Sequence, residues 1–161
     1  MAINKSVDKD RNISKIEFDK AEKLLKRWQK ILRLEDYDIR LQLVDKQWRK
    51  SGDIKIDDSN QQAILLLNNH NRSVNNYEEV IIHELLHLRL WAMDQMIEGM
   101  INVVYGKRED DSKREVVYNE FMLKLESTTQ NLTKAFVGLG AEDKDIPFAY
   151  VEKLVKEELS K

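Results

Sequence analysis

The feature that most constrains the fold is the stretch from Tyr77 to Met96, in which hydrophobic residues leave no consistently polar side. A helix that is apolar nearly all round is buried in a protein core. Residues 83–87 of this stretch read HELLH. Unpaired polar groups are costly inside a core, so these histidines and the glutamate need partners there. We expect a helix over 77–96, capped by Asn75 or Asn76, with a polar site inside it.

The spacing of this motif is typical of a metal site. His83 and His87 are four residues apart, so on a helix both imidazoles project from one face and can bind one ion. Glu84 lies about 100° further round the helix, where it can reach a metal-bound water. Catalytic zinc favours three protein ligands plus water, and it lowers the pKa of that water toward about 7. The motif therefore predicts Zn²⁺ on His83 and His87 with Glu84 as general base. The alternative is an ordinary buried helix that packs two histidines.

The motif leaves the third ligand open. Where a metzincin has glycine and histidine, this chain has Leu90 and Met93, which excludes that class. Asp94 lies about 10 Å along the helix axis from His87, too far to share the ion. His70 belongs to the preceding polar loop and is expected at the surface. An acidic residue on a second helix, predicted over 113–137, is the remaining solution.

Three glutamates of that second helix compete for the role. Glu120 falls opposite the apolar stripe and should face water. Glu115 and Glu126 lie at the edge of the stripe, where a carboxylate can reach a cleft. Glu115 already has an explanation, because Ser112 followed by Glu115 reads as a capping box. We therefore favour Glu126 as the third ligand, with Glu115 as the alternative.

Composition narrows the function classes. The chain has 161 residues and no cysteine, which excludes disulfides, cysteine zinc ribbons, iron–sulfur clusters and thiol nucleophiles. No apolar run reaches the length of a membrane span, so we expect a cytoplasmic protein without a membrane partner. Residues 1–50 have 14 basic and 9 acidic side chains, a balance of +5, but without a dense basic run. We interpret this charge as a solvated face and expect no nucleic-acid partner.

Periodicity predicts an α+β fold in a single domain over 1–161, with a core at about 14–138 and a helical appendage at 139–161. The first helix spans 14–33, and closely spaced short strands suggest a small three-stranded antiparallel sheet. Gly99 and Gly106 suggest a break or loop within 97–112. The predicted strands are 38–44, a short piece around Ile54 and Ile56, and 63–67, and the last helix is 147–159.

At this point the chain resembles the gluzincin metallopeptidases. The resemblance rests on Val80–Leu88, which contains the HELLH motif, and on Glu126–Val137, which is similar to the glutamate helix of that group. The short length is similar to the minigluzincins and to small metallopeptidases encoded in phage and prokaryotic genomes. The resemblance implies a zincin-like fold, zinc bound by His83, His87 and Glu126, and hydrolysis of peptide bonds in a peptide or protein substrate. It does not identify that substrate.

The same resemblance implies roles for other segments. Ala63–Leu67 would be the sheet edge beside the active-site helix, to which a substrate adds as an extra strand. Tyr105 and Tyr118 are candidates for stabilising the oxyanion, although core packing explains both. The three tryptophans are interpreted as packing residues, namely Trp28, Trp48 and Trp91.

Two other functions compete with a peptidase. The first is a non-catalytic binding protein with a zincin fold that acts on a protein or DNA partner. Glu84 speaks against it, because a purely structural metal site does not need a general base. The second is a DNA-associated protease of the SprT group, but the zinc-ribbon cysteines often found there are missing.

Overall fold

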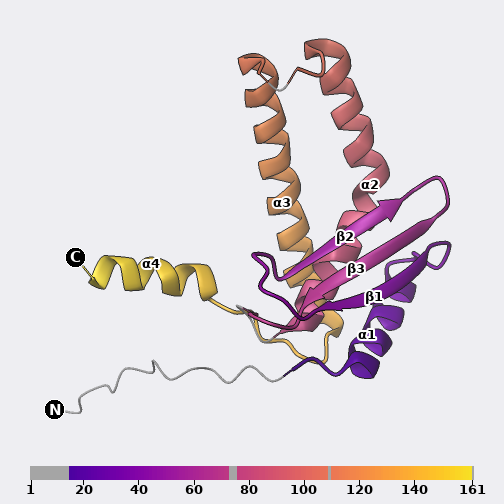
Figure 1. Ribbon diagram of the computed structural model, residues 1–161, viewed down its shortest axis with the longest axis vertical. Helices are drawn as coiled ribbons and strands as arrows, with labels where there is room; N and C mark the ends of the chain where they lie inside the picture. The colour runs from indigo at the N-terminus through magenta and orange to yellow at the C-terminus, as the bar shows by residue number, and fades with distance from the viewer. Residues whose placement is uncertain (1–14, 73–75, 109, 161) are drawn as a thin grey trace.

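The computed structural model describes residues 15–72, 76–108 and 110–160. Within these residues the chain forms four helices and three strands (Figure 1). In chain order they are α1 (Phe18–Ile31), β1 (Asp38–Val44), β2 (Gly52–Asp57), β3 (Gln62–Asn68), α2 (Tyr77–Tyr105), α3 (Ser112–Gly140) and α4 (Ala149–Leu159). The α+β class is confirmed. The first helix starts at Phe18 rather than at residue 14, and Ser14 lies outside the described residues.

The three strands form a mixed sheet in the order β1-β3-β2. β2 is antiparallel to β3, but β1 is parallel to β3, with Asp38 opposite Gln62 and Val44 opposite Asn68. The prediction of a wholly antiparallel sheet was therefore wrong. After β1 the chain crosses to the far side of the sheet to form β2, and it returns through a short turn into the central position. Alternation of apolar residues is the same in parallel and antiparallel strands, so the sequence pattern could not distinguish them.

The central position of β3 also corrects the role expected for Ala63–Leu67. β3 pairs on both sides, so its backbone cannot accept a further strand, and the edge beside α2 belongs to β2. Nor is the run buried on both faces. Ala63, Leu65 and Leu67 are buried, whereas Ile64 is 42% exposed.

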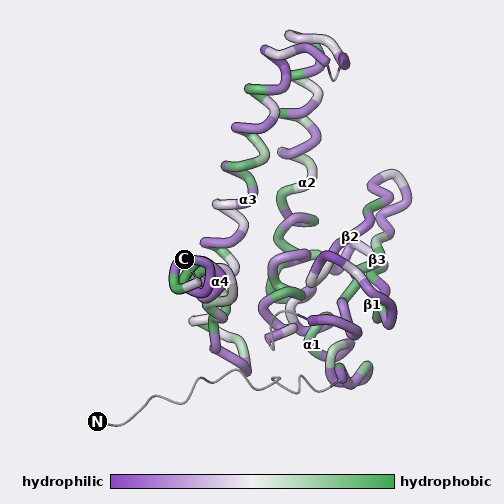
Figure 2. The backbone as a smooth tube through the Cα atoms, turned by 60° about the vertical axis from the view of Figure 1, so that its left-hand side comes forward, coloured by the Kyte–Doolittle hydropathy of each residue, from purple (hydrophilic) through white to green (hydrophobic). Residues whose placement is uncertain are grey.

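The core lies between one face of the sheet and two helices. α1 packs against β1 and α2, while α2 packs against β2 and β3. Figure 2 shows hydrophobic residues recurring along the half of α2 that lies beside the sheet. The fully buried side chains include Leu25, Ile39, Leu65, Ile82 and Leu85. The part of α2 that contains the motif is thus buried, as expected for a helix without a polar side.

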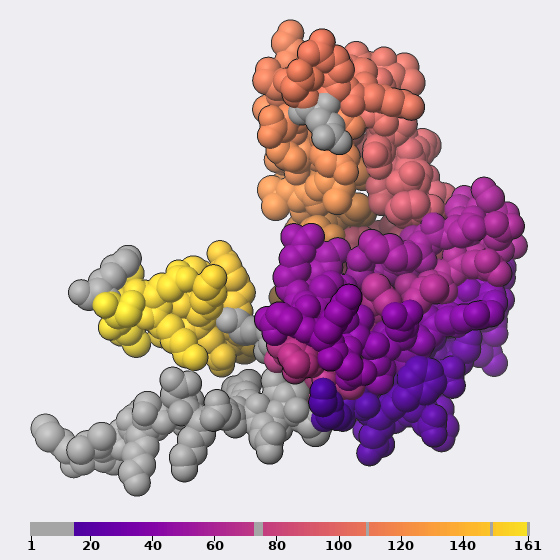
Figure 3. Space-filling model, in the orientation of Figure 1, coloured from indigo at the N-terminus to yellow at the C-terminus, as the bar shows by residue number. Residues whose placement is uncertain are grey.

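α2 and α3 form a long antiparallel hairpin that rises above the surface made by the strands (Figures 1 and 3). Each helix has 29 residues, which corresponds to about 43 Å. α2 continues through Gly99 to Tyr105, so the helix is longer than predicted, and the loop expected within 97–112 begins at Gly106, which is the C-cap of α2. At the start of α3, the cap is Asp111, whose side chain accepts hydrogen bonds from the amides of Lys113 and Arg114. The predicted capping box of Ser112 and Glu115 is therefore wrong.

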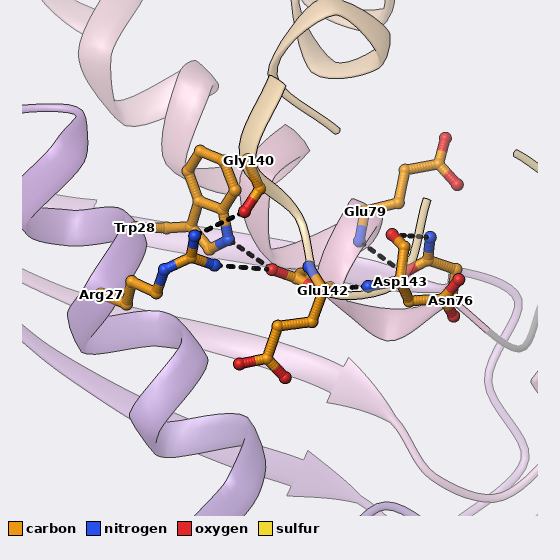
Figure 4. Close-up of polar contacts among 8 residues, drawn as sticks. Arg27, Trp28, Asn76, Glu79, Gly140, Glu142 and Asp143 are labelled. Atoms are coloured by element: carbon orange, nitrogen blue, oxygen red, sulfur yellow. Dashed lines mark hydrogen bonds and ion pairs between the residues drawn. The ribbon is translucent and has the colours of Figure 1, made fainter. Parts of the chain in front are cut away.

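The first turn of α2 is tied to α1 and to the chain that follows α3 (Figure 4). Asn76 caps α2 by accepting from the Glu79 amide, and its side-chain amide donates to the carbonyls of Asp143 and Asp145. Glu78 accepts hydrogen bonds from Trp28 and from the amides of Glu142 and Asp143. These contacts hold the start of α2 firmly, and the HELLH motif begins one turn later.

α4 stands apart from the rest of the molecule (Figures 1 and 3). It leaves Val151, Leu154 and Val155 about half exposed. Among the described residues, no helix combines the length and the apolar character that crossing a membrane requires.

Candidate metal site

The α2–α3 hairpin brings the motif residues and Glu126 together. His83 and His87 project from one face of α2, and Glu126 faces them from α3. The His87 Nε2 atom lies 3.0 Å from Glu126 Oε1, and the His83 Nε2 atom lies 3.5 Å from Glu126 Oε2. The two Nε2 atoms are 3.1 Å apart. One nitrogen from each histidine and one carboxylate oxygen lie within 4.8 Å of one another.

These separations suit a small metal ion. Two ligand atoms that each lie about 2.0–2.1 Å from a tetrahedral zinc are about 3.3 Å apart. The two Nε2 atoms are 3.1 Å apart, and each lies 3.0 or 3.5 Å from the nearer oxygen of Glu126, which is close to that value. Two imidazoles and a carboxylate are also a ligand set that zinc accepts in catalytic sites. The donor atoms present thus fit zinc in both chemistry and spacing.

Neighbouring polar and charged groups shift the pKa values of Glu126 and His83. Hydrogen bonding to His83 and His87 lowers the pKa of the Glu126 carboxyl well below its usual range, although partial burial opposes this. Burial alone would lower the pKa of His83, but the Glu126 carboxylate beside its Nε2 atom and the nearby charge of Glu84 raise it above its ordinary value, because both favour the protonated ring. Without a metal, Glu126 is held as a carboxylate facing two imidazoles.

Glu84 is buried beside this cluster but takes no part in it. Its side chain is 8% exposed, and no hydrogen bond or ion pair to it is found in the described part of the chain. Gly52 of β2 passes so close to α2 that a Cβ atom there would lie 2.4 Å from Val80 and 3.4 Å from Glu84. Burial raises the pKa of the Glu84 carboxyl, and the neighbouring His83 and His87 act in the opposite direction.

Two successive hydrogen bonds support His83 at its Nδ1 atom. Its Nδ1 atom is 2.9 Å from Oε1 of Gln130 on α3. The side-chain amide of Gln130 in turn donates to Glu79 on α2 at 3.0 Å. Both contacts lie on the opposite side of the imidazole ring from the converging Nε2 atom. Outer contacts of this kind commonly orient metal-binding histidines.

The cluster opens into a cleft of about 610 Å³ between α2 and β2. One side of α2 lines it from Glu79 to Asp94, including Glu84 and Trp91. The facing wall is Gly52, Asp53, Ile54 and Ile56 of β2. Pro147 and Tyr150 also line it. The volume is within the range of binding sites for small ligands and short peptide segments.

The other candidates from the sequence lie elsewhere. Glu115 is exposed in the first turn of α3, about 16 Å along the axis from Glu126. His70 is exposed in the loop after β3. Tyr105 is the last residue of α2, and Tyr118 lies against Arg114 with the guanidinium 5.2 Å from the ring centre. None of these four residues lines the cleft.

The sequence analysis missed several residues of the site. Gln130 follows Glu126 by four residues and Glu79 precedes His83 by four, so helical spacing alone could have placed both beside the cluster. Trp91 follows His87 by the same interval, and it lines the cleft rather than only packing in the core. Tyr150 lies after the hairpin, and no such helical spacing relates it to the site residues.

No family model matches this chain, and neither a curated protein nor a solved structure was found that matches it.

Proposed function

We propose that the chain is a zinc-dependent peptidase with a zincin-like fold, in which His83, His87 and Glu126 bind the ion. The observation that carries the proposal is Glu84, a buried carboxylate without a partner among the described residues, placed next to three converging ligand atoms. Glu84 lines the cleft, and holding a carboxylate there at 8% exposure without a described protein partner costs hydration, so such a group needs a functional reason. A general base is such a reason.

The bound ion would supply Lewis-acid activation of a water molecule and of the scissile carbonyl. Glu84 would accept the proton of the attacking water and later donate it to the departing amine. A carboxyl with a raised pKa suits the first step, because it is a stronger base than an exposed carboxylate. Glu126 and the two histidines would hold their positions during the reaction.

The cleft suits an extended peptide. Among the described strands β2 is paired on one side only, and its residues line the cleft beside the cluster. A peptide in extended conformation could pair with this edge through its backbone and thereby pass the metal site. The role that the sequence analysis gave to Ala63–Leu67 thus passes to Gly52–Asp57.

The charge of the cleft favours basic substrates. Asp94 is a partly buried carboxylate on its wall, and no hydrogen bond or ion pair to it is found within the described ranges. It lies two turns beyond His87 on the same side of α2, about 10 Å along the axis. Trp91 provides an aromatic surface beside it. A lysine or arginine side chain two or three residues from the scissile bond would find a charge partner there.

The test is cleavage of a peptide library by zinc-loaded protein, with and without a chelator. Cleavage should require zinc, and Glu84→Gln should keep the metal while turnover falls by about 10²–10⁴-fold. A Glu120→Gln protein, changed at an exposed carboxylate of α3, is the matched control. If Glu84→Gln cleaves peptides as fast as the wild type, the mechanism is wrong. If zinc binds and no peptide is cleaved, the binding-protein alternative is favoured.

A further inference from the structure

The hydrogen bonds that join Glu79, Gln130 and His83 have a direction from donor to acceptor, and Glu79 determines it. This chain of hydrogen bonds runs from Glu79 through Gln130 to His83, and it crosses between α2 and α3 twice. Glu79 is 7% exposed, and Gln130 and His83 are partly buried. All three residues also line the cleft, but the contacts of 2.9 and 3.0 Å pair polar atoms of each with those of its neighbours.

A carboxylate can only accept hydrogen bonds, whereas a glutamine amide has one donating end and one accepting end. Next to Glu79, the Gln130 amide must present its Nε2 end, as observed at 3.0 Å. Its Oε1 end then faces His83 Nδ1 at 2.9 Å. Since Oε1 only accepts, Nδ1 must hold the proton. The neutral ring then has its lone pair on Nε2, the atom that faces His87 and Glu126.

The reverse orientation shows what Glu79 prevents. With the amide flipped, its oxygen would face the Glu79 carboxylate, and its NH₂ group would face Nδ1. The proton of a neutral His83 would then move to Nε2, pointing at the metal position and blocking it. Gln130 alone does not choose between these two orientations, because both ends of its amide can hydrogen-bond to an imidazole.

We propose that Glu79 is a positioning residue that selects the Nδ1-protonated tautomer of His83 by fixing the Gln130 amide. The inference rests on the proposed function only in taking Nε2 of His83 as the metal-binding atom. Glu79 itself is no ligand of the candidate site. Its backbone amide serves the Asn76 cap, which leaves its side chain for Gln130.

The experiment compares Glu79→Gln with the exchanged pair Glu79→Gln/Gln130→Glu. In the single variant two amides face each other, and the direction of the chain is no longer fixed. In the exchanged pair the amide at 79 donates to the carboxylate at 130, which accepts from His83 Nδ1 directly. The direction is restored without a change in net charge or in the number of heavy atoms. Glu120→Gln is the control for removal of a carboxylate.

The first measurement is ¹⁵N NMR of the histidine rings in metal-free protein at about pH 9, where ordinary imidazoles are neutral. The chain has three histidines, so three ring systems need to be assigned. We expect the wild type, the exchanged pair and Glu120→Gln to show His83 protonated at Nδ1. Glu79→Gln should show a mixture of tautomers. The same tautomer in all four proteins would overturn the inference.

The second measurement is zinc affinity by competition with a chromophoric chelator at neutral pH. Outer contacts of metal-binding histidines are worth about 10–100-fold in affinity, so Glu79→Gln should lose about that factor. The exchanged pair should regain it, which a role in helix packing alone does not predict. A wild type that binds no zinc would contradict the proposed function, whereas the NMR result would still decide the role of Glu79. Equal affinity in Glu79→Gln and the wild type would count against the inference.

Discussion

The first turn of α2 and the turns that follow it differ in how they treat a buried glutamate. Glu78, 2% exposed, accepts from Trp28 and from two backbone amides, and it forms an ion pair with Arg27. Glu84, six residues later and 8% exposed, has no such partner in the described chain. In the first region, the Glu78 carboxylate holds α1, α2 and the chain after α3 together. The second leaves Glu84 without a described protein partner beside three potential ligands, so burial alone does not distinguish an acid that holds the fold together from one that is available to a site.

We expect the largest loss of stability when Glu78 is changed, because it has more partners than Glu84. Glu78→Gln replaces a carboxylate by an amide that cannot accept from all of its donors, so buried N–H groups are left unpaired. We expect the free energy of unfolding to fall by about 3–5 kcal/mol. Urea denaturation followed by circular dichroism measures this. An unchanged midpoint would show that the Glu78 contacts do not hold the start of α2.

At Glu84, we expect the same replacement of glutamate by glutamine to raise the free energy of unfolding. Glu84→Gln removes a buried carboxylate that has no partner in the described chain, so metal-free protein should become more stable by about 1–3 kcal/mol. Peptide cleavage should be lost in the same protein, which is a trade of stability for function. Urea denaturation beside Glu78→Gln measures the contrast. A loss of stability similar to that of Glu78→Gln would mean that Glu84 has a structural partner.

Asp94 is a third carboxylate to compare, and it is the last residue of α2 that lines the cleft. If it pairs with substrate rather than with protein, Asp94→Asn should leave stability within about 0.5 kcal/mol. Its kcat/KM should fall about tenfold for peptides with lysine or arginine near the scissile bond, which equals about 1.4 kcal/mol. Neutral peptides should be cleaved as before. An equal loss for both kinds of peptide would exclude a role in specificity.

Asp53 is the carboxylate of the cleft that pairs with lysines, and we expect the smallest change in stability when it is substituted. Burial would raise its pKa, but Lys55 at 2.7 Å and Lys50 at 3.2 Å outweigh burial and lower it below the ordinary 3.8. A carboxyl with a lowered folded-state pKa stabilises the fold above its unfolded pKa and loses that contribution as the pH falls. Asp53→Asn should therefore cost less than about 1 kcal/mol at neutral pH. Thermal melts should show the difference shrinking as the pH falls below 3.8. A difference that does not change with pH would exclude this ion pair as its source.

Much of the fold followed from local patterns, because helical and strand periodicities are local properties. The helix around the HELLH motif, the three strands and the second long helix were all predicted. The choice of Glu126 rested on the face of one helix, and the structure brings this residue to the motif. Its role as a ligand stays a prediction.

What the sequence did not reveal depends on contacts between distant segments. The parallel pairing of β1 with β3 depends on where the chain crosses the sheet, which no alternation of residues encodes. Gly99 and Gly106 both suggested a break, and only Gly106 ends α2. A single glycine costs a helix about 1 kcal/mol, and at Gly99 packing against α3 outweighs that. Asp111, not Ser112, caps α3, a shift of one residue between two side chains that cap equally well.

The most direct test of the account is the zinc content of purified protein by elemental mass spectrometry. Wild type, Glu126→Ala and Glu115→Ala should be compared after zinc loading and desalting. Glu115 is the matched control, because it lies on the same helix and is exposed far from the cluster. The account predicts about one zinc per chain in the wild type and in Glu115→Ala, and a loss in Glu126→Ala. Zinc that is missing from the wild type, or retained in full by Glu126→Ala, would contradict it.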